Sequence, residues 1–93
     1  HVRRGRIKGV FSLYDGEAEL IVAIALETSP LVNKPLAEAE LPDGVMIGAI
    51  FRDGKVSMPH SQTVIKPGDR IVLMALKDYV KDVEQMFRVS IDY

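Results

Sequence analysis

The sequence contains no cysteine, which excludes disulfide bridges and zinc sites built from thiolates. This composition is compatible with a reducing cytoplasm. Long apolar runs are also missing, since none approaches the roughly 20 residues that a membrane-spanning helix needs. The longest run, at residues 20–26, has the length of a β-strand. We therefore expect a domain that forms no membrane segment itself.

Histidine is scarce, with only His1 and His60 in the chain. A serine nucleophile activated by His60 would have to come from Ser57 or Ser61 and would need a third, orienting group. The sequence has no G-x-S-x-G nucleophile elbow and no H-E-x-x-H metal motif. We therefore predict no catalytic residue and no metal site, and we interpret His60 as a loop histidine that faces solvent.

Motifs for nucleotide or nucleic-acid binding are missing as well. The glycines form neither a P-loop nor a G-x-G-x-x-G pattern, so no phosphate cradle is expected within this chain. Four of the twelve basic residues fall in the first eight positions, and from residue 9 onward acidic residues outnumber basic ones by thirteen to eight. A nucleic-acid surface would carry a basic excess on the folded body, so we predict no nucleic-acid partner. The basic "RRGRIK" stretch could contact phosphate, but short charge runs favour a solvated linker or an arm packed on a neighbouring domain.

The length of 93 residues, with 47% apolar residues, is typical of one small domain with a single core. The chain begins at His1 and shows no signal-peptide pattern, which predicts that it is part of a longer protein. We assign residues 1–17 to a linker or arm from a preceding domain, with room for a short strand at residues 7–13. Residues 18–93 are then the folded domain.

Apolar patterns, together with prolines that end regular structure, predict the order of the strands and helices. The stretch "ELIVAIALE" is apolar on both strand faces, so it should be buried on both sides, with a partner subunit or neighbouring domain as cover. A short helix is predicted between Pro35 and Pro42. "RIVLMAL" is a further strand, and "KDYVKDVEQMF" has helical spacing with Asp78 as a candidate N-cap. The predicted fold is therefore α+β: a small β-sheet with a short helix after the first strand, a β-hairpin, a further strand and a C-terminal helix.

Turn chemistry accounts for most of the polar residues in the centre of the chain. Asp53-Gly54 lies between "VMIGAIFR" and "KVSM" and predicts a hairpin whose type I′ turn needs positive φ at both positions. Pro67-Gly68 fits a type II turn. We therefore assign structural turn roles to Asp53, Gly54, Pro67, Gly68 and Asp69.

Two residues beside these turns have open roles. Arg52 directly precedes Asp53, so its guanidinium either forms an ion pair or faces a ligand. Gly48 lies inside a predicted strand, where it marks a bulge or allows another backbone to approach closely.

The combination of three patterns resembles a known family. Lys34-Pro35-Leu36 leading to Pro42, the hairpin "IGAIFRDGKVSMP" and the closing "PGDRIVL" are similar to the C-terminal domain of regulators of K⁺ conductance, the RCK-C or TrkA-C module. The resemblance covers about residues 18–88. The flanks "HVRRGRI" and "VEQMFRVSIDY" are similar to the last domain of bacterial regulators of Trk potassium uptake.

The resemblance implies a non-catalytic regulatory module that follows a Rossmann-type nucleotide-binding domain outside this chain. NAD(H) and ATP are expected on those absent domains, and no cofactor is expected in this one. The implied partners are a second copy in a homodimer, the preceding nucleotide-binding domain and a membrane potassium transporter. The implied location is the cytoplasm, at the inner face of the plasma membrane.

Some family members bind small ligands, including cyclic di-AMP, near the pair interface. No ligand-binding set carries over from the family residue by residue. The alternative function is a nucleotide- or anion-sensing domain with a pocket near Arg52 and the loop of residues 30–36, which makes Arg52, Asn33 and Lys34 the candidate ligand-binding residues. Asn33 stands where many members have glycine, and asparagine tolerates the left-handed geometry of that turn. Ser61-Gln62 replaces a Gly-Asp pair that often follows the hairpin, which changes the expected loop shape.

Overall fold

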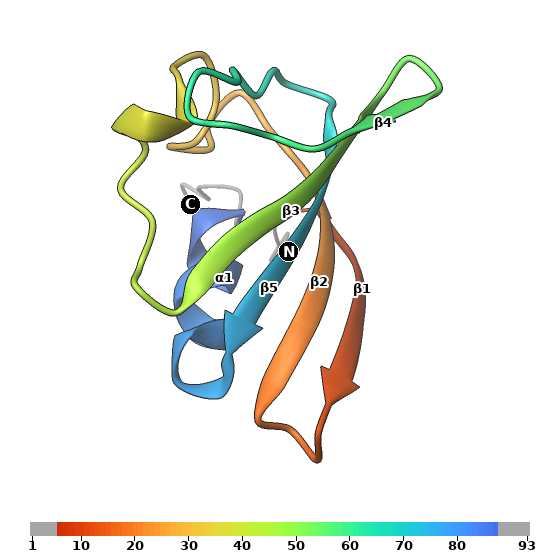
Figure 1. The fold of residues 1–93 in the computed structure, drawn as a ribbon, viewed down its shortest axis with the longest axis vertical. Helices are drawn as coiled ribbons and strands as arrows, with labels where there is room; N and C mark the ends of the chain where they lie inside the picture. Colours follow the sequence, from red (N-terminus) through yellow and green to blue (C-terminus); the bar gives the residue numbers. More distant parts are fainter. Residues whose placement is uncertain (1–5, 88–93) are drawn as a thin grey trace, which may run out of the picture.

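The computed structural model describes residues 6–87, which form a five-stranded antiparallel sheet with a C-terminal helix against one face (Figure 1). The strands lie in the order β1-β2-β5-β3-β4. Their bounds are β1 (Arg6–Leu13), β2 (Ala18–Ile24), β3 (Val45–Arg52), β4 (Lys55–Ser57) and β5 (Arg70–Leu76), and the helical elements are η1 (Leu36–Glu38), η2 (Lys77–Tyr79) and α1 (Val80–Met86). The expected sheet and C-terminal helix are confirmed.

Residues 6–17, which the sequence assigned to a connecting arm, lie in the sheet. β1 pairs with β2 along its length, from Arg6 opposite Ile24 to Leu13 opposite Ala18. The turn between these strands has positive φ at three successive residues, at Tyr14, Asp15 and Gly16. The boundary drawn at residue 18 therefore falls inside a hairpin.

The two faces of β2 differ in burial. Ile21 and Ala23 are fully buried on the face toward α1, whereas Leu20, Val22 and Ile24 on the other face are only partly buried. Burial on both sides, as the apolar pattern of this strand predicted, is therefore not reached within the described residues. We call the face that carries Leu20 the outer face of the sheet.

The core lies between the inner face of the sheet, α1 and the loops that close one end. Helix α1 contributes Val83, and Phe87 follows directly at its C-terminal end; both side chains are fully buried. Burying each such side chain contributes about 1.5–3 kcal/mol to stability. The remaining members are Ile21, Ala23, Ala25, Leu31, Val32, Val45, Ile47, Ile50, Ile65, Ile71, Leu73 and Ala75.

The helix predicted between Pro35 and Pro42 is wrong, because the segment holds only the three-residue 3-10 turn η1. Its backbone forms hydrogen bonds with the loop at residues 61–63. The Leu36 N–H donates to the Thr63 carbonyl and the Ala37 N–H to the Ser61 carbonyl, both at 2.9 Å. These N–H groups lie in the first turn, where a helix has no internal partners for them. After Glu38 the chain is extended again, since Ala39 has a ψ of 134°.

Two finer details of the strands and the helix also follow from local geometry. Gly48 marks a bulge, since the register with β5 shifts between Ile47 and Ala49, and the bulge returns Ile50 to the core side. Asp78 does not cap α1; it lies within η2, and the residue at the cap position is Tyr79, without a side-chain hydrogen bond.

Candidate functional site

The turn between β3 and β4 has the geometry that its sequence requires. Asp53 has a φ of 52° and Gly54 a φ of 77°, both in the left-handed region needed for a type I′ turn. β3 and β4 pair from Ile50 opposite Ser57 to Arg52 opposite Lys55. The turn aspartate is exposed and forms no hydrogen bond through its side chain with the described residues.

Arg52 makes the densest set of polar contacts in the described chain. Its Nε donates to Asp69 Oδ1 at 2.7 Å, and its Nη2 donates both to Asp69 Oδ2 and to the Val64 carbonyl at 3.0 Å. The Lys66 N–H donates to Asp69 Oδ2 at 2.9 Å. Asp69 is 3% exposed and Arg52 39% exposed. We call this arrangement the Arg52–Asp69 clamp.

The sheet register explains why Arg52 meets Asp69 and not its sequence neighbour Asp53. Phe51 on β3 lies opposite Arg70 on β5, so the residues just beyond this pair stand side by side at the strand ends. The Pro67-Gly68 turn then bends the preceding loop back toward the same place, with Gly68 at a φ of 92°. Of the alternatives left open by the sequence, the ion pair is the one that the structure contains.

Both partners of the clamp are stabilised in their charged forms. The hydrogen bond to Asp69 raises the pKa of Arg52 above its ordinary value, and partial burial offsets only some of that rise. Burial alone would raise the pKa of Asp69, but the hydrogen bonds from Arg52 and from the Lys66 N–H outweigh it, and the net pKa lies below its ordinary value.

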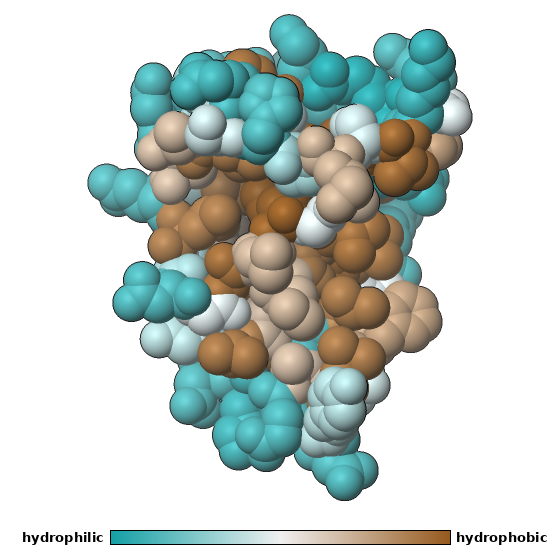
Figure 2. All heavy atoms as spheres, in the orientation of Figure 1, coloured by the Kyte–Doolittle hydropathy of each residue, from teal (hydrophilic) through white to brown (hydrophobic). Residues whose placement is uncertain are grey.

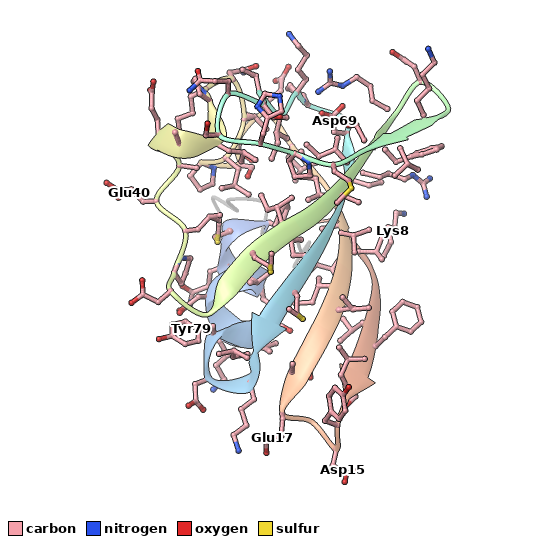
Figure 3. All side chains as sticks on the ribbon, in the orientation of Figure 1. Lys8, Asp15, Glu17, Glu40, Asp69 and Tyr79 are labelled. Atoms are coloured by element: carbon pink, nitrogen blue, oxygen red, sulfur yellow. The ribbon has the colours of Figure 1, made fainter. Side chains whose placement is uncertain are left out.

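Beside the clamp lies an open recess of about 440 Å³ lined by residues 51–53 and 66–70. It brings the exposed side chains of Lys66 and Arg70 near the clamp, at the end of the sheet where Figure 3 labels Asp69. The Arg52 Nη1 forms no hydrogen bond within the described residues. Together these cationic groups could hold a small anion.

Asn33 and Lys34 occupy a neighbouring loop and do not line this recess. Asn33 has a φ of 65°, and its N–H donates to the Ile65 carbonyl at 2.8 Å. Within residues 6–87 no side-chain hydrogen bond joins either residue to Arg52. The segment around Val64 and Ile65 therefore contacts both Arg52 and Asn33. The structure does not, however, bring the three candidate ligand residues together in one site.

His60 takes part in local loop structure. Its Nδ1 accepts a hydrogen bond from the Gln62 N–H at 3.2 Å, and its own N–H donates to Thr63 Oγ1 at 2.9 Å. In the described part of the chain, no group of three or more histidine or carboxylate side chains could hold a metal ion. No helix among residues 6–87 is long and apolar enough to cross a membrane.

The outer face of the sheet is the second candidate site, and it is apolar. Figure 2 shows its middle covered by hydrophobic side chains, with hydrophilic ones at both ends of the strands. Phe11, Met46 and Leu76 are each more than half exposed on this face. The sequence indicated this apolar face only through β2, the strand that is apolar on both sides. Which side chains of β1, β3 and β5 lie on the same face can be known only from the register of the sheet.

Comparison with known proteins places these features in a family. The family model described as the TrkA-C domain matches residues 20–88. The chain belongs to the TrkA-C domain family. The match runs from Leu20, within β2, through α1, and so includes both the Arg52–Asp69 clamp and most of the outer face.

Several curated relatives align with this TrkA-C domain along nearly its whole length. A Trk system potassium uptake protein TrkA from Azorhizobium caulinodans is 56% identical over 93 residues, which is all of this chain and 20% of the relative. Proteins of the same name from Vibrio alginolyticus and Halomonas elongata are 43% and 38% identical, over 97% and 100% of this chain. The TrkA-C domain thus spans about a fifth of the length of these relatives.

Proposed function

We propose that this TrkA-C domain is a non-catalytic regulatory module of a Trk-type potassium uptake system. It acts in the cytoplasm, pairs with a second copy and passes the ligand state of a preceding nucleotide-binding domain to a membrane potassium transporter. The observation that carries this proposal is the 56% identity, over the full chain, to a protein named for Trk potassium uptake. The chain also lacks motifs for catalysis within its sequence, which supports a regulatory role.

In this proposal, NAD(H) or ATP binds domains that lie outside the 93 residues. The relatives are about five times as long as this chain, which leaves room for such domains. The signal reaches the TrkA-C domain through residues 1–17, which include β1 and the turn that leads into β2. A change in the preceding domain would then act on β1, the edge strand of the sheet.

A chimaera tests this function in cells. The matching 93 residues of the Azorhizobium caulinodans relative are replaced by this chain, and the chimaera is expressed in bacteria that lack their own copy of that regulator. We expect it to restore growth and potassium uptake at low external potassium. A relative from which the segment is deleted, expressed at the same level, serves as the negative control. A folded, well-expressed chimaera that performs no better than this control would contradict the proposal.

A second candidate function is the sensing of a small anion or nucleotide by this domain itself. The observation in favour is the recess beside the clamp, lined by Lys66, Arg70 and Arg52, whose Nη1 has no hydrogen bond to any of residues 6–87. Calorimetry of the 93-residue chain against NADH, ATP, cyclic di-AMP and potassium would then show saturable binding of one of them. That binding should be lost on Arg70→Ala and retained on Lys81→Ala, an exposed helix residue away from the recess. Four silent titrations would reject this function.

A further inference from the structure

The hairpin of β3 and β4 projects from one end of the sheet and carries apolar side chains on its surface (Figure 1). β4 pairs only with β3, and all three of its residues are exposed. Val56 is 69% exposed, Met58 just after β4 is 83% exposed, and Phe51, opposite Val56, is 42% exposed. Single exposed apolar side chains are ordinary, but three gathered on one narrow hairpin indicate a contact surface.

The register of the sheet places the entry of the chain at the same end. Arg6, the first described residue, lies opposite Ile24 on β2, and Ile24 lies opposite Arg70 on β5. Arg70 in turn lies opposite Phe51, and Phe51 lies opposite Val56. Neighbouring strands are about 4.8 Å apart, so the backbones of Arg6 and Val56 are separated by about 19 Å. The chain therefore enters the sheet in the same row as the hairpin.

This position matters because the proposed function attaches a nucleotide-binding domain upstream of β1. The relatives are about five times as long as this chain, which leaves room for such a domain. Of the arm assigned from the sequence, only residues 1–5 precede the sheet, and five residues span about 17 Å at full extension. A domain of 100 residues has a radius of gyration of about 13 Å. An upstream domain on this tether is therefore large enough to reach the hairpin.

Basic side chains flank the apolar ones on this hairpin. Lys55 precedes Val56 on β4, and Arg70 lies opposite Phe51. Both basic side chains are exposed, and neither forms an ion pair within residues 6–87. Interfaces combine an apolar centre with a polar rim, and their charges are complementary across the contact. The hairpin therefore fits a partner surface that is apolar in the middle and carries carboxylates at its edge.

The Arg52–Asp69 clamp gives the hairpin a fixed base. Arg52 is the last residue of β3, and its guanidinium bonds to Asp69 and to the Val64 carbonyl. Ile65, the next residue of that loop, is fully buried in the core. A displacement of the hairpin is therefore passed to the loop of residues 64–69 and to the core beneath it.

We infer that the β3–β4 hairpin is the surface on which the upstream nucleotide-binding domain docks, through an apolar patch edged with carboxylates. A ligand-dependent movement of that domain then acts on β3 and the clamp as well as on β1. This inference rests on the proposed function, from which it takes the upstream domain, and specifies the contact through which that domain acts.

Carbodiimide cross-linking of the chimaera with the Azorhizobium caulinodans relative tests this contact. The reagent activates a carboxylate, the amine of a touching lysine attacks it, and an amide forms as the carbodiimide leaves as a urea. Lys55 on the hairpin and Lys81 on α1 are both exposed and serve as matched probes. Mass spectrometry of the peptides should show Lys55 joined to carboxylates of the upstream domain. Links to that domain from Lys81 as often as from Lys55 would overturn the inference.

Hydrogen exchange measures the same contact without a reagent. Peptides that cover residues 51–58 should exchange at least about tenfold more slowly in the chimaera than in the 93-residue chain. Peptides that cover the turn at residues 14–17, at the opposite end of the sheet, should exchange alike in both. The two proteins are compared at the same protomer concentration, so that pairing of copies affects both equally. Equal exchange of residues 51–58 in the two proteins would overturn the inference.

Charge reversal at the two matched lysines completes the test. In the chimaera, Lys55→Glu should remove the slow exchange of residues 51–58, because it places a carboxylate against carboxylates. Lys81→Glu should leave that exchange slow, and equal urea midpoints of the two variants in the 93-residue chain would show that both fold. A chimaera that restores potassium uptake without protecting the hairpin overturns only this inference. One that protects the hairpin without restoring uptake contradicts only the proposed function.

Discussion

The Arg52 guanidinium joins three pieces of backbone that lie apart in the sequence. It connects the end of β3 to the Val64 carbonyl and, through Asp69, to the N–H of Lys66. Asp69 is nearly inaccessible to water, so removing its partner leaves a buried carboxylate with one remaining donor. The clamp therefore holds the recess loop against the sheet, whether or not a ligand binds there.

Arg52→Ala and Asp69→Ala should each lower the free energy of unfolding by about 2–3 kcal/mol, because each leaves a charged partner unpaired. The double variant should lose clearly less than the sum of the two. Urea unfolding of the four proteins measures this coupling. Lys77→Ala is the control: it removes an exposed ion pair with Glu17, worth about 0–1 kcal/mol. Strictly additive losses would contradict the clamp.

The lowered pKa of Asp69 makes part of this stability dependent on pH. Because its folded-state pKa lies below the ordinary value of about 3.9, the contribution is fully present above that pH and is lost as pH falls through the folded pKa. Urea unfolding at pH 7 and near pH 3 should show the wild type losing its advantage over Asp69→Asn in acid. An advantage that is the same at both pH values would argue against a stabilised carboxylate. Arg52 stays protonated throughout this range.

The sequence left the role of Arg52 open and assigned Asp69 to a turn. It did not predict an ion pair between the two. Adjacency favoured Asp53 as the partner, whereas the real pair depends on the register of β3 with β5. That register is set by the bulge at Gly48 and by burial along both strands, which are properties of the whole sheet. Local turn chemistry could be predicted, and the contact between distant turns could not.

At the scale of elements, strands and tight turns follow from the sequence because their signals are local. The positive φ values at Asp53, Gly54 and Gly68 match the residues that tolerate them. The segment between Pro35 and Pro42 holds only the 3-10 turn Leu36–Glu38, and the backbone is extended again at Ala39, so the predicted helix does not form. The candidate cap at Asp78 failed because a 3-10 turn precedes α1.

Two glycines near β3 should respond very differently to a methyl group. A Cβ at Gly44 would lie 2.2 Å from the Tyr79 ring, whereas at Gly48 the nearest atom is the Val72 carbonyl oxygen at 3.8 Å. Gly44→Ala should therefore destabilise the domain by about 1–3 kcal/mol, and Gly48→Ala by less than about 0.5 kcal/mol. Thermal unfolding compares them directly. Equal melting temperatures would show that the ring moves away at no cost.

At the scale of the whole molecule, residues 6–87 have a continuous core but leave one sheet face apolar and open. The sequence indicated the open face only on β2, since that strand is apolar on both sides. The shared apolar face across four strands depends on topology, which the sequence alone did not supply. The account therefore depends on a second copy covering this face.

Sedimentation velocity of the wild-type 93-residue chain, over a concentration series through the micromolar range, tests this dependence most directly. The account predicts a sedimentation coefficient that rises with concentration to the value of a compact dimer. A single species with the mass of a monomer at every concentration would contradict the account.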